Sequence, residues 1–396
     1  LFVLKALING ADGVLVSGCH PRDCHYSAGN FYARRRLEML KQFLPILGIN
    51  PDRFAYTWVS ASEGQRWKEV VTNFTNKIHE LGPAPKWEDV PAVYDAKFDV
   101  PAPARKLLAE QRECLADLKE AVKATLAEGF EGVLGWKQGY DAIHAEPFMM
   151  TKPEDVEALI WGPFNVHNLA VSLPQYKGKK IGVIVKGCDS KGVVELLSEN
   201  LINRDDVKII AMGCNGTAST ARILEKLPEG AKITACDCKG DTLTVTADGQ
   251  DFAMTMAEVA QNKCRVCPKP NPRYYDVFVG EQVVEPESVE DGRSPALRFL
   301  DAMSLEQRMG FWKGQMERCI ACHACRAACP MCACRDHCVS DARNPAWVSQ
   351  EDTVQQKLFF QLIHAQHLAG RCTGCGECER ACPMDIPVFA LKQQFG

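Results

Sequence analysis

Two runs of cysteines near the carboxyl end of the chain have the spacing of iron–sulfur ligands. The first run reads Cys-x-x-Cys-x-x-Cys-x-x-x-Cys-Pro over residues 319–330, and the second repeats this pattern over residues 372–383. Thiolates at this spacing are typical of a pair of [4Fe–4S] clusters. A zinc site or a set of disulfides does not require two complete copies of one run. The sequence therefore predicts a ferredoxin-like unit with two clusters.

The fourth cysteine of each run is predicted to bind the cluster of the other run, as it does in two-cluster ferredoxins. One cluster then has as ligands Cys319, Cys322, Cys325 and Cys382. The other has Cys372, Cys375, Cys378 and Cys329. The proline after each fourth cysteine turns the chain and offers no competing amide donor.

Cysteines also follow two predicted strands in the middle of the chain. We expect a strand over 180–188, a helix over 190–200 and a strand over 207–214, which together form a parallel crossover. Cys188 and Cys214 end the two strands. Because parallel strands end at the same edge of a sheet, these two thiols are expected to converge.

The middle region holds four more cysteines, in a predicted hairpin over 233–246 and in a following loop. The hairpin carries Cys236 and Cys238, and the loop carries Cys264 and Cys267. We predict a third [4Fe–4S] site whose ligands are Cys214, Cys264, Cys267 and one of Cys188, Cys236 or Cys238. The alternative is a zinc site that joins Cys236 and Cys238 to Cys264 and Cys267.

Three cysteines follow the first ferredoxin run too closely for all of them to serve it: Cys332, Cys334 and Cys338. Three roles are open for them. They could complete the middle site, they could build a further cluster with Cys236 or Cys238, or they could be spare buried thiols. A lone Cys114 lies on a helix predicted over 105–128, where a buried apolar role is expected.

The amino-terminal region alternates strand and helix, which predicts a small α/β layer with a parallel sheet. A strand is expected over 10–18, followed by a helix, and a second strand is expected over 54–59 before another helix. Cys19 and Cys24 lie at the carboxyl end of the first strand, where ligands gather in such sheets. Two cysteines alone do not complete a cluster, so ordinary thiols beside a turn are the alternative.

The stretch from Gly10 to Asn30, with its Gly-Cys-His-Pro-x-Asp-Cys-His-Tyr core, closely resembles the delta subunit of methyl-viologen-reducing hydrogenase. The resemblance covers residues 1–82. It implies a [2Fe–2S] cluster for which Cys19 and Cys24 are two of the ligands. The family's upstream cysteines have no counterpart here, so a truncated or missing start is expected. It also implies electron transfer to the flavin-bearing A subunit of heterodisulfide reductase.

Two further resemblances cover the rest of the chain. Val185-Lys-Gly-Cys-Asp189, Gly213-Cys-Asn-Gly216 and Lys263-Cys-Arg-Val-Cys-Pro268 are similar to the beta-subunit family of coenzyme-F420-type hydrogenases and dehydrogenases. This implies iron–sulfur rather than zinc in the middle region, although no counterpart of the family's flavin and deazaflavin site follows. The ferredoxin domain, with a helix expected between its two cysteine runs, resembles the iron–sulfur domain of heterodisulfide reductase C subunits.

These observations predict an α/β protein with a carboxyl-terminal α-helical dicluster domain. The expected parts are a hydrogenase-delta-like domain (1–82), a Pro-rich linker with a helix (83–129), a beta-subunit-like α/β domain with Cys-rich loops (130–295) and the ferredoxin domain (296–396). The 396 residues carry a formal net charge of −4, which gives no reason to expect nucleic acid as a partner. We expect no membrane span, and free thiolates predict a reducing, cytoplasmic location.

Neither a nucleophile–base constellation nor a dinucleotide fingerprint is present, so we expect an electron-relay subunit rather than an enzyme with its own substrate. The expected complex is anaerobic. Its partners are a heterodisulfide reductase A-like flavoprotein in a flavin-based bifurcating core and a primary dehydrogenase, which is a hydrogenase, a formate dehydrogenase or an NADH-type enzyme. The alternative is a flavin-containing, deazaflavin- or ferredoxin-dependent reductase with its active site in residues 130–295.

Overall fold

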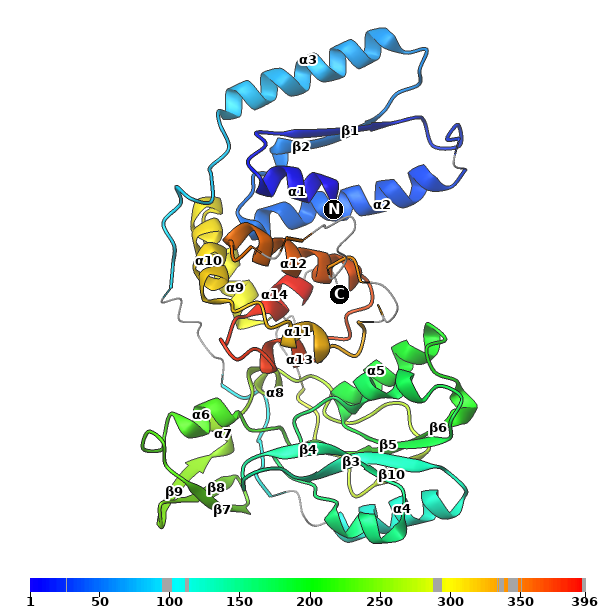
Figure 1. The fold of residues 1–396 in the computed structure, drawn as a ribbon, viewed down its shortest axis with the longest axis vertical. Helices are drawn as coiled ribbons and strands as arrows, with labels where there is room; N and C mark the ends of the chain where they lie inside the picture. Colours follow the sequence, from blue (N-terminus) through cyan, green and yellow to red (C-terminus); the bar gives the residue numbers. More distant parts are fainter. Residues whose placement is uncertain are drawn as a thin grey trace.

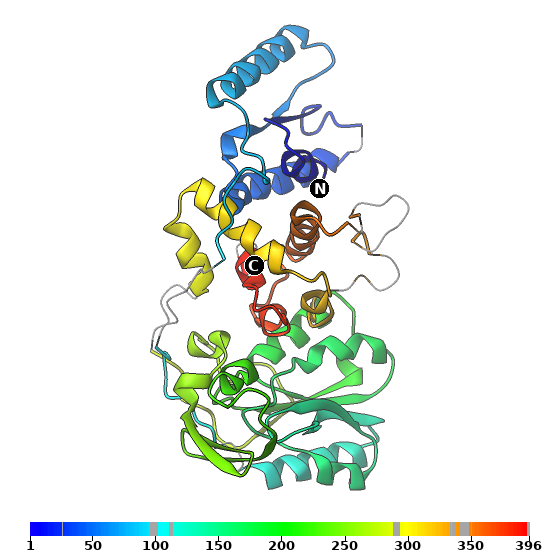
Figure 2. The ribbon, with the colours of Figure 1, turned by 60° about the vertical axis from the view of Figure 1, so that its left-hand side comes forward.

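Three tiers follow one another along the longest axis of the molecule (Figure 1). Of the described residues, those within 1–82 form the upper tier, those within 102–287 the lower tier and those within 294–393 the central tier. The part of the chain that comes last in sequence thus lies between the other two, as Figure 2 also shows. The computed structural model describes residues 1–25, 27–94, 102–110, 114–287, 294–332, 334, 338–340, 348–349 and 351–393.

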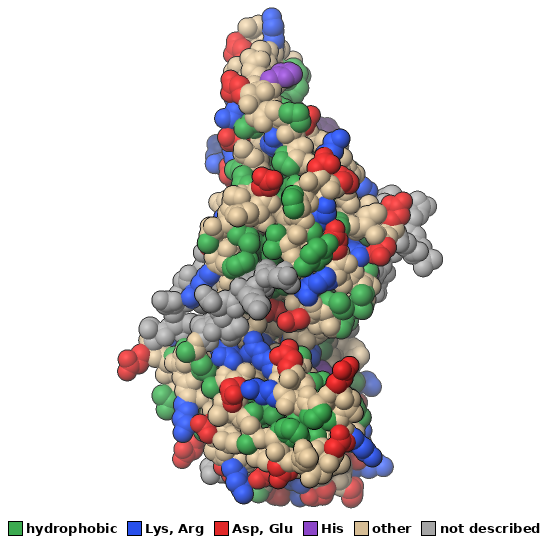
Figure 3. Space-filling view, turned by 90° about the vertical axis from the view of Figure 1, so that its left-hand side faces the viewer, with side chains coloured by type: hydrophobic (Ala, Val, Ile, Leu, Met, Phe, Trp, Pro, Cys, Tyr) green, Lys and Arg blue, Asp and Glu red, His purple; other side chains and the backbone are tan. Residues whose placement is uncertain are grey.

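The upper tier is the small α/β layer that the sequence predicts. Its two strands, β1 (Val14–Gly18) and β2 (Phe54–Trp58), are parallel. The surrounding helices are α1 (Phe2–Ile8), α2 (Gly29–Phe43), η1 (Leu44–Leu47), η2 (Pro51–Arg53) and α3 (Gly64–Leu81). None of the residues of α3 is fully buried, and the molecule is narrowest at this end (Figure 3).

A five-stranded mixed sheet forms the lower tier, in the order β10-β6-β5-β3-β4. All neighbours are parallel except β3 and β4. The strands are β3 (Gly132–Gln138), β4 (Ala145–Met150), β5 (Ile181–Val185), β6 (Val207–Met212) and β10 (Val277–Val279). The helices are α4 (Leu115–Ala127), α5 (Gly187–Ser198), η3 (Pro153–Ala158), η4 (Leu169–Tyr176) and η5 (Arg204–Asp206). Helices α4 and α5 lie on opposite faces of the sheet (Figure 1).

An antiparallel three-stranded sheet stands beside the larger one, and its first two strands form the predicted hairpin. The strands are β7 (Ile233–Lys239), β8 (Thr242–Ala247) and β9 (Gln250–Thr255). Short helices flank this sheet, namely α6 (Thr220–Leu224), α7 (Met256–Val259) and α8 (Asn262–Arg265).

The central tier is helical. Its helices are α9 (Pro295–Asp301), α10 (Leu305–Arg318), α11 (Ala324–Ala327), α12 (Val354–His367), α13 (Glu377–Arg380) and α14 (Val388–Gln393). Among the described residues, no helix has both the length and the apolar character needed to cross a bilayer.

The helix predicted over 105–128 is wrong at its start, because residues 105–110 form no helix. Residues 111–113 lie outside the described residues, and α4 begins at Leu115. Residues 109–110 instead contact the β7–β8 turn. The backbone N–H groups of Ala109 and Glu110 donate to the carbonyl of Gly240 at 2.8 and 3.1 Å. Leu107 is buried in the core beneath that turn. Tertiary hydrogen bonds and burial therefore override the local helix propensity.

Two cysteines expected in other surroundings lie in helices. Cys188 is in the first turn of α5, not at the end of β5, because a capping box starts the helix early: Asp189 accepts the N–H of Lys186 at 3.1 Å. Cys264 lies in α8 rather than in a loop, and its N–H donates to the carbonyl of Gln261 at 2.9 Å. Both changes turn the sulfur atoms into the space below the central tier.

One hydrophobic core spans the upper and central tiers and includes α1, η1, α10 and α12. Trp312 on α10 donates its indole N–H to the carbonyl of Ile46 at 2.8 Å, and Arg308 donates to the carbonyl of Pro45 at 3.1 Å. Gly48 follows with a φ of +81°, and a Cβ there would lie 2.1 Å from the carbonyl oxygen of Leu305. A residue without a side chain is therefore required where η1 meets α10.

We expect Gly48→Ala to lower the free energy of unfolding by more than about 2 kcal/mol, because it adds a backbone clash to the cost of a left-handed conformation. Gly178→Ala is the matched control, since Gly178 has a φ of +85° with nothing within 4 Å of the added Cβ. Thermal unfolding followed by circular dichroism compares the two. Equal losses in both variants would show that the contact with α10 is unimportant.

Candidate iron–sulfur centres

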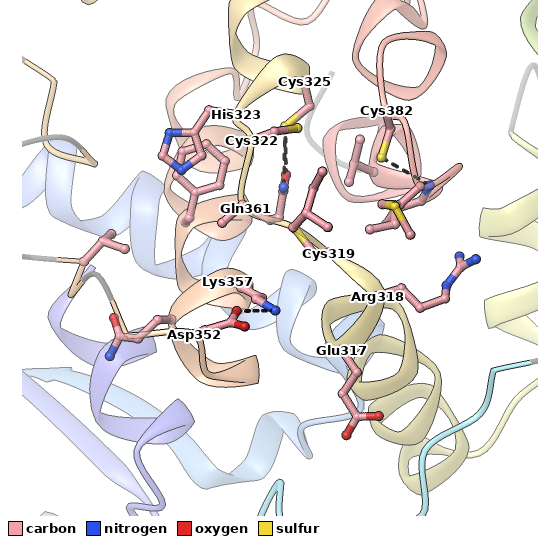
Figure 4. Close-up of a pocket in the computed structure, with 18 of the residues that line it drawn as sticks. Glu317, Arg318, Cys319, Cys322, His323, Cys325, Asp352, Lys357, Gln361 and Cys382 are labelled. Carbon is pink, nitrogen blue, oxygen red and sulfur yellow. Dashed lines mark hydrogen bonds and ion pairs between the residues drawn. The ribbon is translucent and has the colours of Figure 1, made fainter.

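Cys319, Cys322, Cys325 and Cys382 line one open cavity of about 1090 Å³ in the central tier. Figure 4 shows that they come from separate elements: the end of α10, the loop after it, α11 and the segment after α13. Both runs therefore contribute to one site, as the predicted ligand exchange requires. We call this the outer ferredoxin site.

The two ferredoxin loops are bent in the same way. In the first loop Ala321 and His323 have positive φ, and in the second Gly374 and Gly376 do. Left-handed residues between the cysteines turn successive backbone N–H groups towards one point, which favours an anion. The first loop bears the strain of two non-glycine residues, and His323 stacks on Phe360 with ring centroids 4.1 Å apart.

Gln361 of α12 reaches the outer ferredoxin site from behind. Its side-chain amide donates to the sulfur of Cys325 at 3.5 Å, and both side chains are buried (Figure 4). The backbone N–H of Ile386 donates to Cys382 at 3.4 Å. Hydrogen bonds to ligand sulfurs are one of the means by which a protein sets the potential of a cluster.

Cys329, Cys372, Cys375 and Cys378 come together on the side of the central tier that faces the lower tier, and we call them the inner ferredoxin site. Burial, with the nearby Cys375, raises the pKa of Cys329 to about 12. Burial also raises the pKa of Cys378. Such thiols are neutral when unligated, and iron binding deprotonates them.

The charge around the two ferredoxin sites fits the negative clusters that they are predicted to hold. Lys392 on α14 is only 1% exposed, and its ammonium group has no hydrogen-bond partner among the described residues. Burial opposes its charge, but Cys378 and Cys325, one from each site, raise its pKa. A buried, unpaired ammonium group is costly unless an anion lies nearby. The chemistry of the donor set thus agrees with anionic clusters.

Four of the six cysteines in the middle region line one cavity. Cys188, Cys214, Cys264 and Cys267 line a cavity of about 230 Å³ between β6, α5 and α8, which we call the lower site. Cys375 of the inner ferredoxin site lines the same cavity.

Cys236 and Cys238 do not line that cavity; they lie on β7 against the core of the smaller sheet. Of the three alternatives for the fourth ligand, the geometry therefore favours Cys188. The zinc alternative requires Cys236 and Cys238 beside Cys264 and Cys267, and the structure separates these pairs.

Buried charges and hydrogen bonds surround the lower site. Thr217 donates its backbone N–H to the sulfur of Cys264 at 3.3 Å. Burial and the nearby Cys264 raise the pKa of Cys214 to about 12. Lys186 is buried in an ion pair with Asp189 at 2.8 Å. The N–H of Thr217 is a hydrogen-bond donor to a ligand sulfur, which is the kind of contact that tunes a metal centre. The Lys186–Asp189 pair is neutral overall.

Cys332, Cys334 and Cys338 lie together beside α12, with Cys332 hydrogen-bonded through its N–H to the carbonyl of Cys329 at 3.1 Å. They line neither the lower site nor the sheet that holds Cys236 and Cys238. The predicted joint cluster with β7 is therefore not supported. Cys114 occupies the N-cap position of α4 without a side-chain cap hydrogen bond and lies beside Gly280, in keeping with an apolar role.

Cys19 and Cys24 lie in the loop after β1. Although burial opposes the change, hydrogen bonds from Cys24 and Asn30 lower the pKa of Cys19. His20 holds the loop to the start of α3 through Glu63 at 2.6 Å. The two cysteines of the predicted [2Fe–2S] site therefore share one loop, and their role as ligands stays a prediction.

Sequence reasoning missed Lys392, Gln361 and Lys263. Lys392 leaves a trace in the sequence, since it is a lone charge in the apolar run Val388-Phe-Ala-Leu-Lys. Lys263 directly precedes Cys264, but nothing local shows that it pairs with Glu377 across the tiers.

The fold and these cysteine sites define an iron–sulfur protein of the electron-transfer type. Residues 1–82 match the family model of the delta subunit of methyl-viologen-reducing hydrogenase. Residues 315–386 match the 4Fe–4S dicluster domain. The resemblances of both segments predicted from the motifs are thereby confirmed.

Individual relatives agree with these assignments. The iron–sulfur D subunit of the F420-non-reducing hydrogenase from Archaeoglobus profundus is 51% identical over 82 residues, 21% of this chain and 60% of that protein. The A subunit of the ferredoxin:CoB-CoM heterodisulfide reductase from Methanosarcina mazei is 46% identical over 82 residues, 21% of this chain and 10% of that protein. The chain thus spans less than two thirds of these relatives.

The middle of the chain is similar to a third relative. The beta subunit of the F420-dependent formate dehydrogenase from Methanocaldococcus jannaschii is 26% identical over 317 residues, 65% of this chain and 82% of that protein. This confirms the beta-subunit resemblance. A chain of the F420-reducing [NiFe] hydrogenase complex from Methanosarcina barkeri shares 15% identity over 46% of this chain and 69% of that one, with a TM-score of 0.32.

We expect Lys392→Met to lower the reduction potentials of the ferredoxin clusters, because removing a buried positive charge disfavours the added electron. Redox titration followed by EPR measures the shift. Lys41→Met, an exposed position on α2, is the control and should leave the potentials unchanged. Unaltered potentials in Lys392→Met would contradict the placement of this charge beside the clusters.

Proposed function

We propose that the protein is an electron relay within an anaerobic oxidoreductase complex. The observation that carries this proposal is the central position of the two ferredoxin sites, between the lower site and the upper tier (Figure 1). Clusters bound at these sites would supply one-electron carriers. A row of carriers through the length of a molecule suits conduction from one end to the other.

The contact between the lower site and the inner ferredoxin site supports a continuous path. Cys375 shares a cavity with Cys188 and Cys264. Lys263 stands between them and is ion-paired with Glu377, which lies two residues after Cys375 in the second ferredoxin run. This buried ion pair fixes the lower site beside the inner ferredoxin site. Clusters bound at the two sites would therefore stay close enough to exchange electrons.

The two ends suit different partners. The upper tier matches the delta-subunit family, which supports docking on a heterodisulfide reductase A-like flavoprotein. The lower tier, similar to a formate dehydrogenase beta subunit, would face a hydrogenase, formate dehydrogenase or other dehydrogenase. The ferredoxin domain occupies the centre and joins the ends. We further propose that the flavoprotein partner belongs to a flavin-based bifurcating core. The complex would lie in the reducing cytoplasm.

We expect Cys375→Ser to remove one [4Fe–4S] signal from the EPR spectrum and to abolish electron transfer between the two ends, while the upper tier stays folded. The physical reason is the loss of a thiolate ligand at the contact between the lower and central tiers. Cys236→Ser is the control, because Cys236 lies outside the candidate sites. Wild-type transfer rates in Cys375→Ser would refute the relay through this site.

A second candidate function, a flavin-containing reductase, is favoured by one cavity. A space of about 590 Å³ lies between the lower and central tiers and is lined by Phe164, Arg222, Arg380 and Phe389, among others. Its size lies within the range of cofactor pockets. Flavin released by denaturing the purified chain would favour this function. A chain that stays flavin-free after incubation with FAD or FMN would exclude it.

A further inference from the structure

Three cysteines that neither ferredoxin site uses surround a very small cavity beside α12. Cys332, Cys334 and Cys338 line it together with His364, and its volume is about 20 Å³. That is roughly the space of one water molecule or one ion. The lower site, by contrast, leaves about 230 Å³ between four cysteines. The contrast in volume favours a single-atom occupant here over a cubane.

His364 is the unusual member of this group. It is 4% exposed, and both of its ring nitrogens are buried without a hydrogen-bond partner among the described residues. An imidazole that has given up its hydrogen bonds to water loses free energy unless another group binds it. Because His364 lines the same cavity as the three thiols, a ligand there would satisfy one of these nitrogens.

The charge around the cavity suits three thiolates. Arg326 donates to the sulfur of Cys338 at 3.5 Å, and Arg371 lines the same cavity. Arg371 is in turn held by Glu199 on the lower tier. The guanidinium groups thus offset the negative charge that metal-bound sulfur atoms would bring into a half-buried place.

We propose that Cys332, Cys334, Cys338 and His364 form a mononuclear zinc site of the Cys₃His type. Three thiolates and one neutral imidazole are a complete donor set for tetrahedral Zn²⁺, with no position left open. The site would be structural and independent of the relay. It would hold the chain that follows Cys329 against α12, and so steady a ligand of the inner ferredoxin site.

The donors have to move to close on a metal ion. Among the described residues, no three His, Cys, Asp or Glu side chains are close enough together to hold an ion as they stand. Cys334 and Cys338 already lie within hydrogen-bonding reach of each other. Side-chain rotation about the cavity is the movement that we expect on binding.

The test is metal analysis and zinc K-edge absorption spectroscopy of the full chain, purified anaerobically with its iron and supplied with Zn²⁺. We expect one zinc per chain, with three sulfur neighbours at about 2.3 Å and one nitrogen neighbour at about 2.0 Å. A chain that retains no zinc would overturn the proposal, and so would a zinc shell of four sulfur atoms.

Two variants identify the ligands. Cys334→Ser should lose the zinc and keep the iron content and the EPR signals of the wild type, whereas loss of iron instead would show a cluster and overturn the proposal. His364→Gln should remove the nitrogen neighbour or weaken zinc retention at least tenfold. The matched control is His367→Gln, because His367 lies on the same helix and lines the same cavity. If zinc depends on His367 and not on His364, the assignment is wrong.

Discussion

The largely buried ion pair between Lys263 and Glu377 is the contact on which the arrangement of the lower and central tiers depends. Lys263 and Arg380 both bind the carboxylate, the latter at 2.9 Å, and the backbone N–H of Asn168 approaches it at 3.4 Å. Although burial opposes ionisation, these cations lower the pKa of Glu377 to about 2. Buried pairs contribute little net stability, but a mispaired charge is costly. The network therefore determines how the lower and central tiers dock on each other, and it adds little to the strength of that contact.

The same region also gathers buried positive charge around the cysteine sites. Lys186 and Lys392 are buried and Lys263 is largely so, all of them around cysteine sites, where a globular protein would ordinarily place apolar side chains. Each ammonium group is tolerable only next to negative charge. Lys186 and Lys263 already have carboxylate partners, Asp189 and Glu377. Lys392 has no hydrogen-bond partner among the described residues, so its charge depends on the cysteine sites as much as they depend on it.

The sequence predicts what local spacing determines. The eight ferredoxin cysteines are set by short loops, so their pattern predicts both the chemistry and the exchange of the fourth ligands. The choice of Cys188 over Cys238 depends on how α5 and β7 pack, and no short-range pattern contains that information. The contact between Ile46 and Trp312 is equally hidden, because it joins residues far apart in the chain. For this reason, the central position of the last domain could not be predicted.

The shared core of the upper and central tiers has a consequence for biosynthesis. A ribosome releases residues 1–82 long before α10 and α12 exist, so the apolar side chains of α1 and η1 remain without their partners while the lower tier is made. Until α10 and α12 are synthesised, the exposed apolar side chains of this segment have to be protected from aggregation by chaperones or by partial packing among themselves. Its final closure coincides with the arrival of the ferredoxin loops, so the shared core closes at the stage at which the two ferredoxin sites need iron and sulfide.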